Sequence, residues 1–272
     1  MKESSVHLSL SRRVWEEYRA AQKKRNRLVR LTQLLILLGA FGLWELAGRL
    51  KWIDVLLFSY PSKIFTLLYE QISTGEMLPH IGATVWETLV GFILGTVAGT
   101  ALAVLIWWSP FLERVLDPYI VVLNSLPKVA LGPLFIVGLG PGYTSIIGMT
   151  LAITVIITTL VVYSSFKEVD TNYLRVIRVF GGGKSQIFRK AVFPASVPTI
   201  VSTLKVNVGL AWVGVIVGEF LVSKQGLGYL IIYGFQVFNF TLVIASLLVI
   251  AVVAALMYQA VAWLENRLNN RW

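Results

Sequence analysis

The chain has 272 residues, of which 56% are hydrophobic and only 14% are charged, and its formal net charge is +10. With a mean hydropathy of +0.74, it is far too apolar for a soluble domain of this length, so we expect an integral membrane protein. The absence of cysteine excludes disulfides, thiolate metal sites and thiol redox chemistry.

Residues 1–30 form a polar, basic tail, and an apolar run at residues 31–48 follows it. A membrane span takes roughly 20 mostly apolar residues, and a long polar lead without a small-x-small cleavage site favours a retained anchor over a signal peptide. Glu45, inside the run, is expected to cap the helix or to pair near Arg49. The next segment, residues 62–72, is amphipathic and predicts a helix along the outer membrane surface.

Further apolar segments that are long enough to cross a membrane follow at residues 81–108, 119–138, 144–166, 199–222 and 241–264. The uncharged run from Gln225 onward is too long for one span and too short for two, so residues 228–237 predict a short external or re-entrant helix. We therefore expect an all-α integral membrane protein with about six transmembrane helices, in which residues 31–272 form one membrane domain.

Lysine and arginine concentrate in the tail and in the loop at residues 167–198, whereas the alternate loops hold few of them. This asymmetry predicts that both termini and the loop at residues 167–198 face the cytoplasm. The same charge attracts anionic lipid of the inner leaflet. Nucleic acid is therefore not needed as a partner to explain the basic composition.

Glycine recurs every fourth residue at Gly91, Gly95 and Gly99, and Gly214 and Gly218 repeat the spacing. Such small-residue ridges let helix backbones approach closely. The sequence leaves two interpretations open: packing within the chain, or a seam toward a pore or a second subunit.

The third span is predicted to break near its middle, at Pro127 and Pro133, and broken helices commonly line substrate paths. Lys128, beside the break, either presents its ammonium group to an anionic solute or pairs with Glu87 or with backbone carbonyl groups. The candidate residues of a translocation path are Asn124, Pro127, Lys128, Pro133 and Glu219.

The other charges inside the spans have structural explanations. Lys205 lies near one end of the fifth span and is expected to extend to the membrane interface. For Glu219, at the opposite end, a hydrogen bond to the following glycine-rich turn is favoured over contact with a solute. With only His7 and His80 as histidines, and no paired carboxylates at helical spacing inside a span, we expect no catalytic or metal site and no enzyme.

The loop at residues 167–198 predicts two short helices around Gly181, the second of which ends at Pro194. In the first, Leu174, Ile177 and Phe180 share one apolar face, so the hairpin is suited to docking in a groove of another protein. The sequence Gly183-Lys184-Ser185 is no phosphate-binding loop, because Arg178 stands where its first glycine belongs. ATP is therefore expected on a separate subunit.

The spacing Leu174, Arg178, Gly181 and Pro194 resembles the cytoplasmic "EAA" loop of binding-protein-dependent ABC importer permeases, with Arg175, Val176 and Ile177 in place of Glu-Ala-Ala. Other motifs occur in the family's order: Pro61-Ser62, the run at residues 124–134, Gly218-Glu219-Phe220, and Gly226-Leu227-Gly228-Tyr229. Together they resemble the nitrate, taurine and aliphatic-sulfonate branch over residues 55–265.

The resemblance implies a permease of the bacterial or archaeal inner membrane that works with cytoplasmic ATP-binding subunits, an extracytoplasmic binding protein and a second permease subunit, as a homodimer. It implies import of a small anion such as nitrate, taurine or an alkyl sulfonate, or alternatively of a vitamin-precursor heterocycle, with ATP on the partner and no cofactor here. The residues implied to contact the ATPase are Leu174, Arg175, Ile177, Arg178, Phe180, Gly181 and Pro194. An ion-coupled carrier, the alternative of another class, would need a coupling acid near the midplane.

Overall fold

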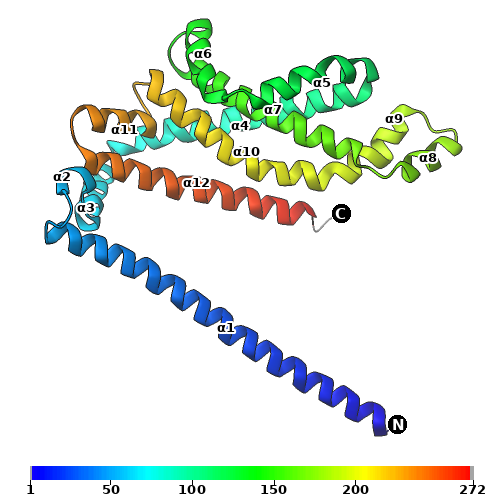
Figure 1. Ribbon diagram of the computed structural model, residues 1–272, viewed down its shortest axis with the longest axis horizontal. Helices are drawn as coiled ribbons and strands as arrows, with labels where there is room; N and C mark the ends of the chain where they lie inside the picture. Colours follow the sequence, from blue (N-terminus) through cyan, green and yellow to red (C-terminus); the bar gives the residue numbers. More distant parts are fainter. Residues whose placement is uncertain (1, 270–272) are drawn as a thin grey trace. The chain divides into compact units, whose positions relative to one another are not determined.

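A computed structural model describes residues 2–269, and this part of the chain is helical and contains no strand. The chain divides after Phe65 into two compact units, each of which is described by itself (Figure 1). The boundary expected after residue 30 lies inside the first helix, because that helix continues without a break from the basic tail into the apolar run.

The first unit contains α1 (Lys2–Arg49) and the short α2 (Val55–Phe58), and α3 (Pro61–Ser73) begins in it. Within α1, the part from Gln22 to Arg49 is long and apolar enough to cross a membrane. Glu45 pairs with Arg49 as expected, at 2.6 Å, and also accepts the Ser62 backbone N–H at 2.9 Å. The carboxylate therefore ties the end of α1 to the start of α3.

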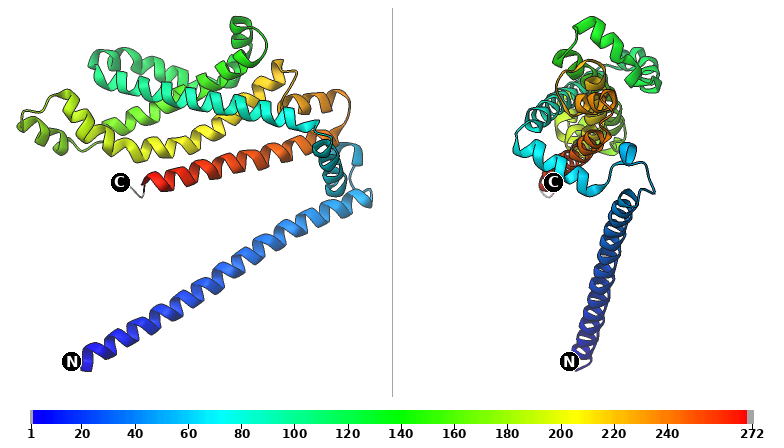
Figure 2. Two further views of the ribbon diagram at one scale, coloured as in Figure 1. Left: turned by 180° about the vertical axis from the view of Figure 1, so that it is seen from behind. Right: turned by 90° about the vertical axis from the view of Figure 1, so that its left-hand side faces the viewer.

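Four long helices run side by side in the second unit: α4 (Met77–Trp108), α7 (Tyr143–Lys167), α10 (Phe193–Val222) and α12 (Phe240–Asn269) (Figures 1 and 2). The broken third span consists of α5 (Pro110–Ser125), the 3-10 turn η1 (Lys128–Leu131) and α6 (Gly132–Leu139), with a bend of 97°. Counting this bent pair as one span gives six spans in the described residues, which confirms the expected number.

Short helices occupy the two ends of this bundle. At one end lie α8 (Thr171–Val179), α9 (Lys184–Ile187) and the π-helical turn η2 (Phe188–Val192), and at the other lies α11 (Leu227–Gln236), as Figures 1 and 2 show. The short helix predicted at residues 228–237 is therefore present. We call the α8–α9–η2 segment the hairpin.

The glycine ridge of α4 packs against a threonine ladder on α7. A Cβ atom added to Gly91 would lie 2.5 Å from Thr150 Cγ2, and one added to Gly99 would lie 2.5 Å from Thr158 Cβ. The hydroxyl groups of Thr150 and Thr158 donate to carbonyl groups one turn earlier in their own helix, and their carbon atoms face Gly91 and Gly99. Of the two interpretations that the sequence left open, the structure supports packing within the chain.

Polar side chains tie α10 to its neighbours. Asn207 is fully buried, and its Nδ2 donates to Thr96 Oγ1 of α4 at 2.9 Å and to Thr158 Oγ1 of α7 at 2.7 Å. Lys205 forms an ion pair with Glu265 of α12. The expectation that Lys205 simply extends to the interface is therefore corrected: α12 supplies the partner that stabilises its charge.

Candidate functional site

The hairpin begins and ends at residues suited to those positions. The Asp170 carboxylate accepts the Asn172 backbone N–H at 2.8 Å and so caps the first turn of α8. Gly181 follows the helix with φ of +77°, a left-handed conformation that glycine adopts without strain. The turn expected at this glycine is therefore present, and it returns the chain toward the bundle.

The apolar side chains of α8 lie on two different faces. Leu174 and Ile177 pack against the chain's own core, which is formed there by Ala103, Ile106, Val162, Tyr163, Phe166, Ile187 and Val192. The exposed apolar side chains of the helix are Tyr173, Val176, Val179 and Phe180. The expectation that Leu174, Ile177 and Phe180 share a face for a protein partner is therefore wrong for Leu174 and Ile177. Their helical spacing is equally compatible with packing against the chain's own core, and that core covers them.

Arg175 and Arg178, which the family resemblance implies as contacts of the ATPase, are both exposed on α8. Near them, Tyr173, Val176, Ile177, Lys190, Ala191, Pro194 and Ala195 line a hollow of about 510 Å³. We call Tyr173, Val176 and Phe180 the outer face of the hairpin. It combines an apolar surface with positive charge, which suits an acidic or neutral groove on a protein partner.

An aromatic cluster fixes the base of the hairpin to the bundle. The Phe188 ring centroid lies 5.0 Å from that of Trp107 and 5.6 Å from that of Phe166. Lys184 Nζ donates to the Trp108 backbone carbonyl at 2.6 Å. Phe188 was not among the expected site residues, although a phenylalanine among basic residues is a signal that its ring packs against the core.

Pro194 does not end a helix, contrary to expectation. The residues from Lys184 to Val222 form one apolar helical stretch, and Pro194 lies in the first turn of α10, directly after the π-helical turn η2. The helix accommodates this proline, which has no N–H to donate, directly after the wider π-helical turn, so it does not end there. The second arm of the hairpin, α9 and η2, is therefore continuous with α10, whereas the glycines at residues 181–183 separate it from α8.

The bend of the third span brings Asn124, Pro127 and Lys128 together. Lys128 is half-buried, and its Nζ donates to the Asn124 backbone carbonyl at 2.8 Å. Pro133 lies in the first turn of α6, on the far side of the bend. Of the two pairings weighed for Lys128, the one with a backbone carbonyl is present, whereas Glu87 is buried and faces Glu219 instead.

Glu219 does not lie with the other candidate path residues. It is 1% exposed, and its Oε2 accepts the Gly228 backbone N–H at 2.6 Å. The expected hydrogen bond to the glycine-rich turn is confirmed. Because the side chain is enclosed by protein, Glu219 is removed from the residues that line a path in this conformation.

Side chains of α4 and α10 bind three successive backbone N–H groups at the start of α11. The first N–H groups of a helix have no partner within that helix. Here the amides of residues 226, 227 and 228 donate to His80 Nδ1 at 3.0 Å, Thr84 Oγ1 at 2.8 Å and Glu219 Oε2 at 2.6 Å. We call these contacts the turn network.

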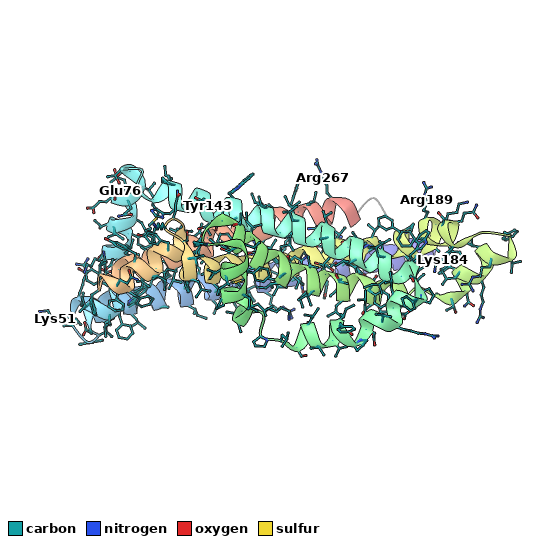
Figure 3. The ribbon with its side chains drawn as sticks, turned by 90° about the horizontal axis from the view of Figure 1, so that it is seen from above. Lys51, Glu76, Tyr143, Lys184, Arg189 and Arg267 are labelled. Atoms are coloured by element: carbon teal, nitrogen blue, oxygen red, sulfur yellow. The ribbon has the colours of Figure 1, made fainter. Side chains whose placement is uncertain are left out.

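The hairpin and the turn network lie at opposite ends of the second unit. Figure 3 shows Lys184 and Arg189 at one end, and Glu76 and Tyr143 at the other. Tyr143 donates through its hydroxyl group to Gln225, which precedes the turn network in the chain. In the part of the chain that the structure describes, no group of three or more His, Cys, Asp or Glu side chains gathers as metal ligands would.

Comparison with known proteins gives concordant matches. The family model of the binding-protein-dependent transport system inner membrane component matches residues 91–270. The putative aliphatic sulfonates transport permease protein SsuC of Bacillus subtilis is 29% identical over 92% of this chain and 91% of the relative. The formylaminopyrimidine transport permease protein ThiX of Halalkalibacterium halodurans is 29% identical over 87% and 94%. The nitrate import permease protein NrtB of Synechocystis sp. is 31% identical over 69% and 68%.

Solved structures share the fold. The inward-facing MetNI methionine ABC transporter aligns with a TM-score of 0.60 at 20% identity, over 70% of this chain and 95% of that one. The bacterial alginate ABC transporter in complex with its alginate pentasaccharide-bound periplasmic protein aligns with a TM-score of 0.62 at 16% identity, over 89% and 97%. At these identities the likeness concerns the arrangement of helices.

Proposed function

The chain belongs to the family of binding-protein-dependent transport system inner membrane components, and we propose that it carries a small anion along the bend of its third span. It is a multi-pass permease subunit of an ABC importer, and such a subunit is not itself an enzyme, because ATP is hydrolysed on a separate subunit. Membership of this family also sets aside the ion-coupled carrier.

The ammonium group of Lys128, half-buried beside the bend, is the observation that carries the proposed solute class. A charged side chain at membrane depth costs about 2.5–3.5 kcal/mol or more when it faces hydrocarbon. The Lys128 ammonium group therefore needs water or protein beside it. A water-filled path along Lys128, Asn124 and Pro127 would hydrate this group, and the group could then bind an anion in the path. Two of the relatives are named for anions, a sulfonate and nitrate.

A second copy of the chain covers the rest of that face in this proposal. Large apolar side chains are exposed along α5 and α6, and they include Tyr119, Val122, Leu134 and Val137. A homodimer whose two bends meet around the path would bury these side chains and would keep both Lys128 groups hydrated.

The proposed partner at the hairpin is the ATP-binding subunit. The outer face of Tyr173, Val176 and Phe180 would fill a groove on that subunit, with Arg175 and Arg178 at its rim, while Leu174 and Ile177 hold the hairpin from inside. Closure of the ATPase pair would displace the hairpin, and α10 would move with it, because α9 and η2 continue into α10 without a break. ATP stays on the partner in this scheme, and the chain itself carries no cofactor.

In the proposed orientation the hairpin and both termini are cytoplasmic. Lysine and arginine distribution supports this assignment. The turn network then faces the other side, where an extracytoplasmic binding protein would deliver the solute. The alginate transporter among the matched structures was captured with its periplasmic protein.

Uptake by reconstituted importer tests the solute class. Vesicles containing the permease, its ATPase and its binding protein would be offered nitrate, taurine, an alkyl sulfonate and formylaminopyrimidine. We expect Lys128→Met to lower anion uptake about tenfold, equivalent to roughly 1.4 kcal/mol of barrier, with basal ATP hydrolysis retained. Lys128→Arg is the matched control and should keep most of the uptake.

Two outcomes would contradict the anion proposal. Uptake of formylaminopyrimidine alone, unchanged in Lys128→Met, would favour a vitamin-precursor heterocycle, the solute class for which one relative is named. Failure of Lys128→Met to accumulate, with Lys128→Arg normal, would show that the ammonium group is needed for folding or assembly.

A further inference from the structure

Glu87, in α4, is fully buried and has no donor within reach. Neither of its carboxyl oxygens accepts a hydrogen bond from any group in the described part of the chain. Glu87 lies one turn beyond Thr84 in α4, and the Thr84 hydroxyl group donates to Glu219 Oε1 at 2.6 Å, so the Glu87 and Glu219 side chains meet between α4 and α10. The two acids come from different spans and are 132 positions apart in the sequence (219 minus 87).

Two carboxylates in this position cannot both be charged. Like charges that share a buried site repel strongly, and a hydrogen bond between two carboxyl groups requires one proton. Among the described residues, the ion pairs join other residues, so no Lys or Arg neutralises either acid. The other titratable groups at this place are His80 of α4 and Tyr229 of α11, whose rings stack at 5.8 Å.

The contacts of Glu219 favour it as the acid that carries the charge. Its Oε1 accepts the Thr84 hydroxyl group at 2.6 Å, and its Oε2 accepts the Gly228 N–H at 2.6 Å. It also lies at the N-terminus of α11, where the helix dipole favours a negative charge. Glu219 therefore has every feature of an ionised acceptor, and the proton belongs on Glu87.

We propose that Glu87 and Glu219 share one proton, with Glu87 as the neutral donor, and that this carboxyl pair positions the start of α11. Glu87 acts through Glu219, so it is a positioning residue that contacts neither solute nor ATPase. The shared proton links Glu87 of α4 to Glu219 of α10. Thr84 of α4 and Glu219 in turn accept the first N–H groups of α11, so the three helices are held together. This arrangement does not depend on which solute is carried.

Paired amide variants test the assignment. Glu87→Gln keeps a donor of the same size, so we expect it to accumulate, to melt within a few degrees of the wild type and to transport normally. Glu219→Gln turns an acceptor into an amide whose NH₂ group faces the Thr84 hydroxyl or the Gly228 N–H. We expect it to lose most of the folded, transport-competent protein. A side chain that merely fills space would make the two variants equivalent.

Infrared spectroscopy of the purified protein supplies a direct signature. The wild type should show the carbonyl stretch of a buried neutral carboxylic acid, which shifts slowly in heavy water. The band should disappear in Glu87→Gln and persist in the control Glu113→Gln, which removes an acid paired with Lys167 elsewhere.

Three results would overturn the proposal. No such band in the wild type would mean that both acids are charged and that a bound cation, rather than a proton, lies between them. A band that persists in Glu87→Gln would place the proton elsewhere. Equal behaviour of Glu87→Gln and Glu219→Gln, whether both fail or both are tolerated, would remove the distinction between donor and acceptor.

Discussion

The two ends of the four-helix bundle differ in which groups they expose and which they bury. At the hairpin end, an aromatic cluster fixes the base while Tyr173, Val176 and Phe180 remain exposed. At the α11 end, the turn network satisfies its backbone groups internally and buries the side chains that do so. Exposed apolar surface costs free energy until a partner covers it, whereas a satisfied polar network stabilises one conformation.

This difference separates two kinds of mutational effect. Changes on the outer face of the hairpin should weaken association with a partner and leave the folded chain intact. Changes in the turn network should destabilise the chain itself, before any partner is considered.

The largest effect is expected from Gly226→Ala in the turn network. Gly226 has φ of +124°, and an added Cβ atom would overlap the Glu219 carboxyl group. Strain and overpacking together should cost on the order of 3 kcal/mol of unfolding free energy. Thermal unfolding of the purified chain measures it. Gly75→Ala is the matched control, because Gly75 also has a positive φ but lies in open space. Equal losses in the two variants would mean that strain alone acts.

Phe180→Asp, on the outer face of the hairpin, should show the opposite pattern. The Phe180 side chain is 86% exposed, so unfolding should change by no more than about 0.5 kcal/mol. Binding of the ATPase should weaken by about 2 kcal/mol or more, because an apolar anchor is replaced by a charge. Pull-down and a melting curve of the same preparation measure both.

Val179→Asp is the control for this variant. Val179 is 84% exposed but lies outside the proposed outer face, so its substitution should weaken binding less than Phe180→Asp does. Equal weakening would indicate a general effect of charge on the hairpin, and wild-type binding by both would show that the ATPase docks elsewhere.

Cysteine labelling tests the orientation of the two ends and should have no effect on stability. The chain has no native cysteine, so single cysteines at Ser185, in the hairpin, and at Ser73, at the end of α3, are the only targets. In intact cells, an impermeant thiol reagent should modify the cysteine at position 73 and spare that at position 185, with both modified after lysis. The reverse pattern would invert the proposed topology.

The sequence analysis located the spans and the glycine ridge but mistook the partners of several side chains. Spacing correctly placed Leu174 and Ile177 together on one face of α8, yet it could not tell whether the chain's own core or another protein covers that face. A proline alone predicts the end of a helix at Pro194. This prediction is wrong, because a π-helical turn lets α10 continue from the hairpin, and that turn has no clear local signal in the sequence.

By itself, the sequence determined the all-helical membrane fold, the number of spans and the bend of the third span, because hydrophobic length and proline act locally along the chain. Only the tertiary structure decided which groups meet. The threonine ladder opposite Gly91 and Gly99, the ion pair of Lys205 with Glu265, and the carboxyl pair of Glu87 with Glu219 each join separate helices. Such pairings depend on how helices rotate and pack against one another, and periodicity within one helix carries no information about its neighbour's register.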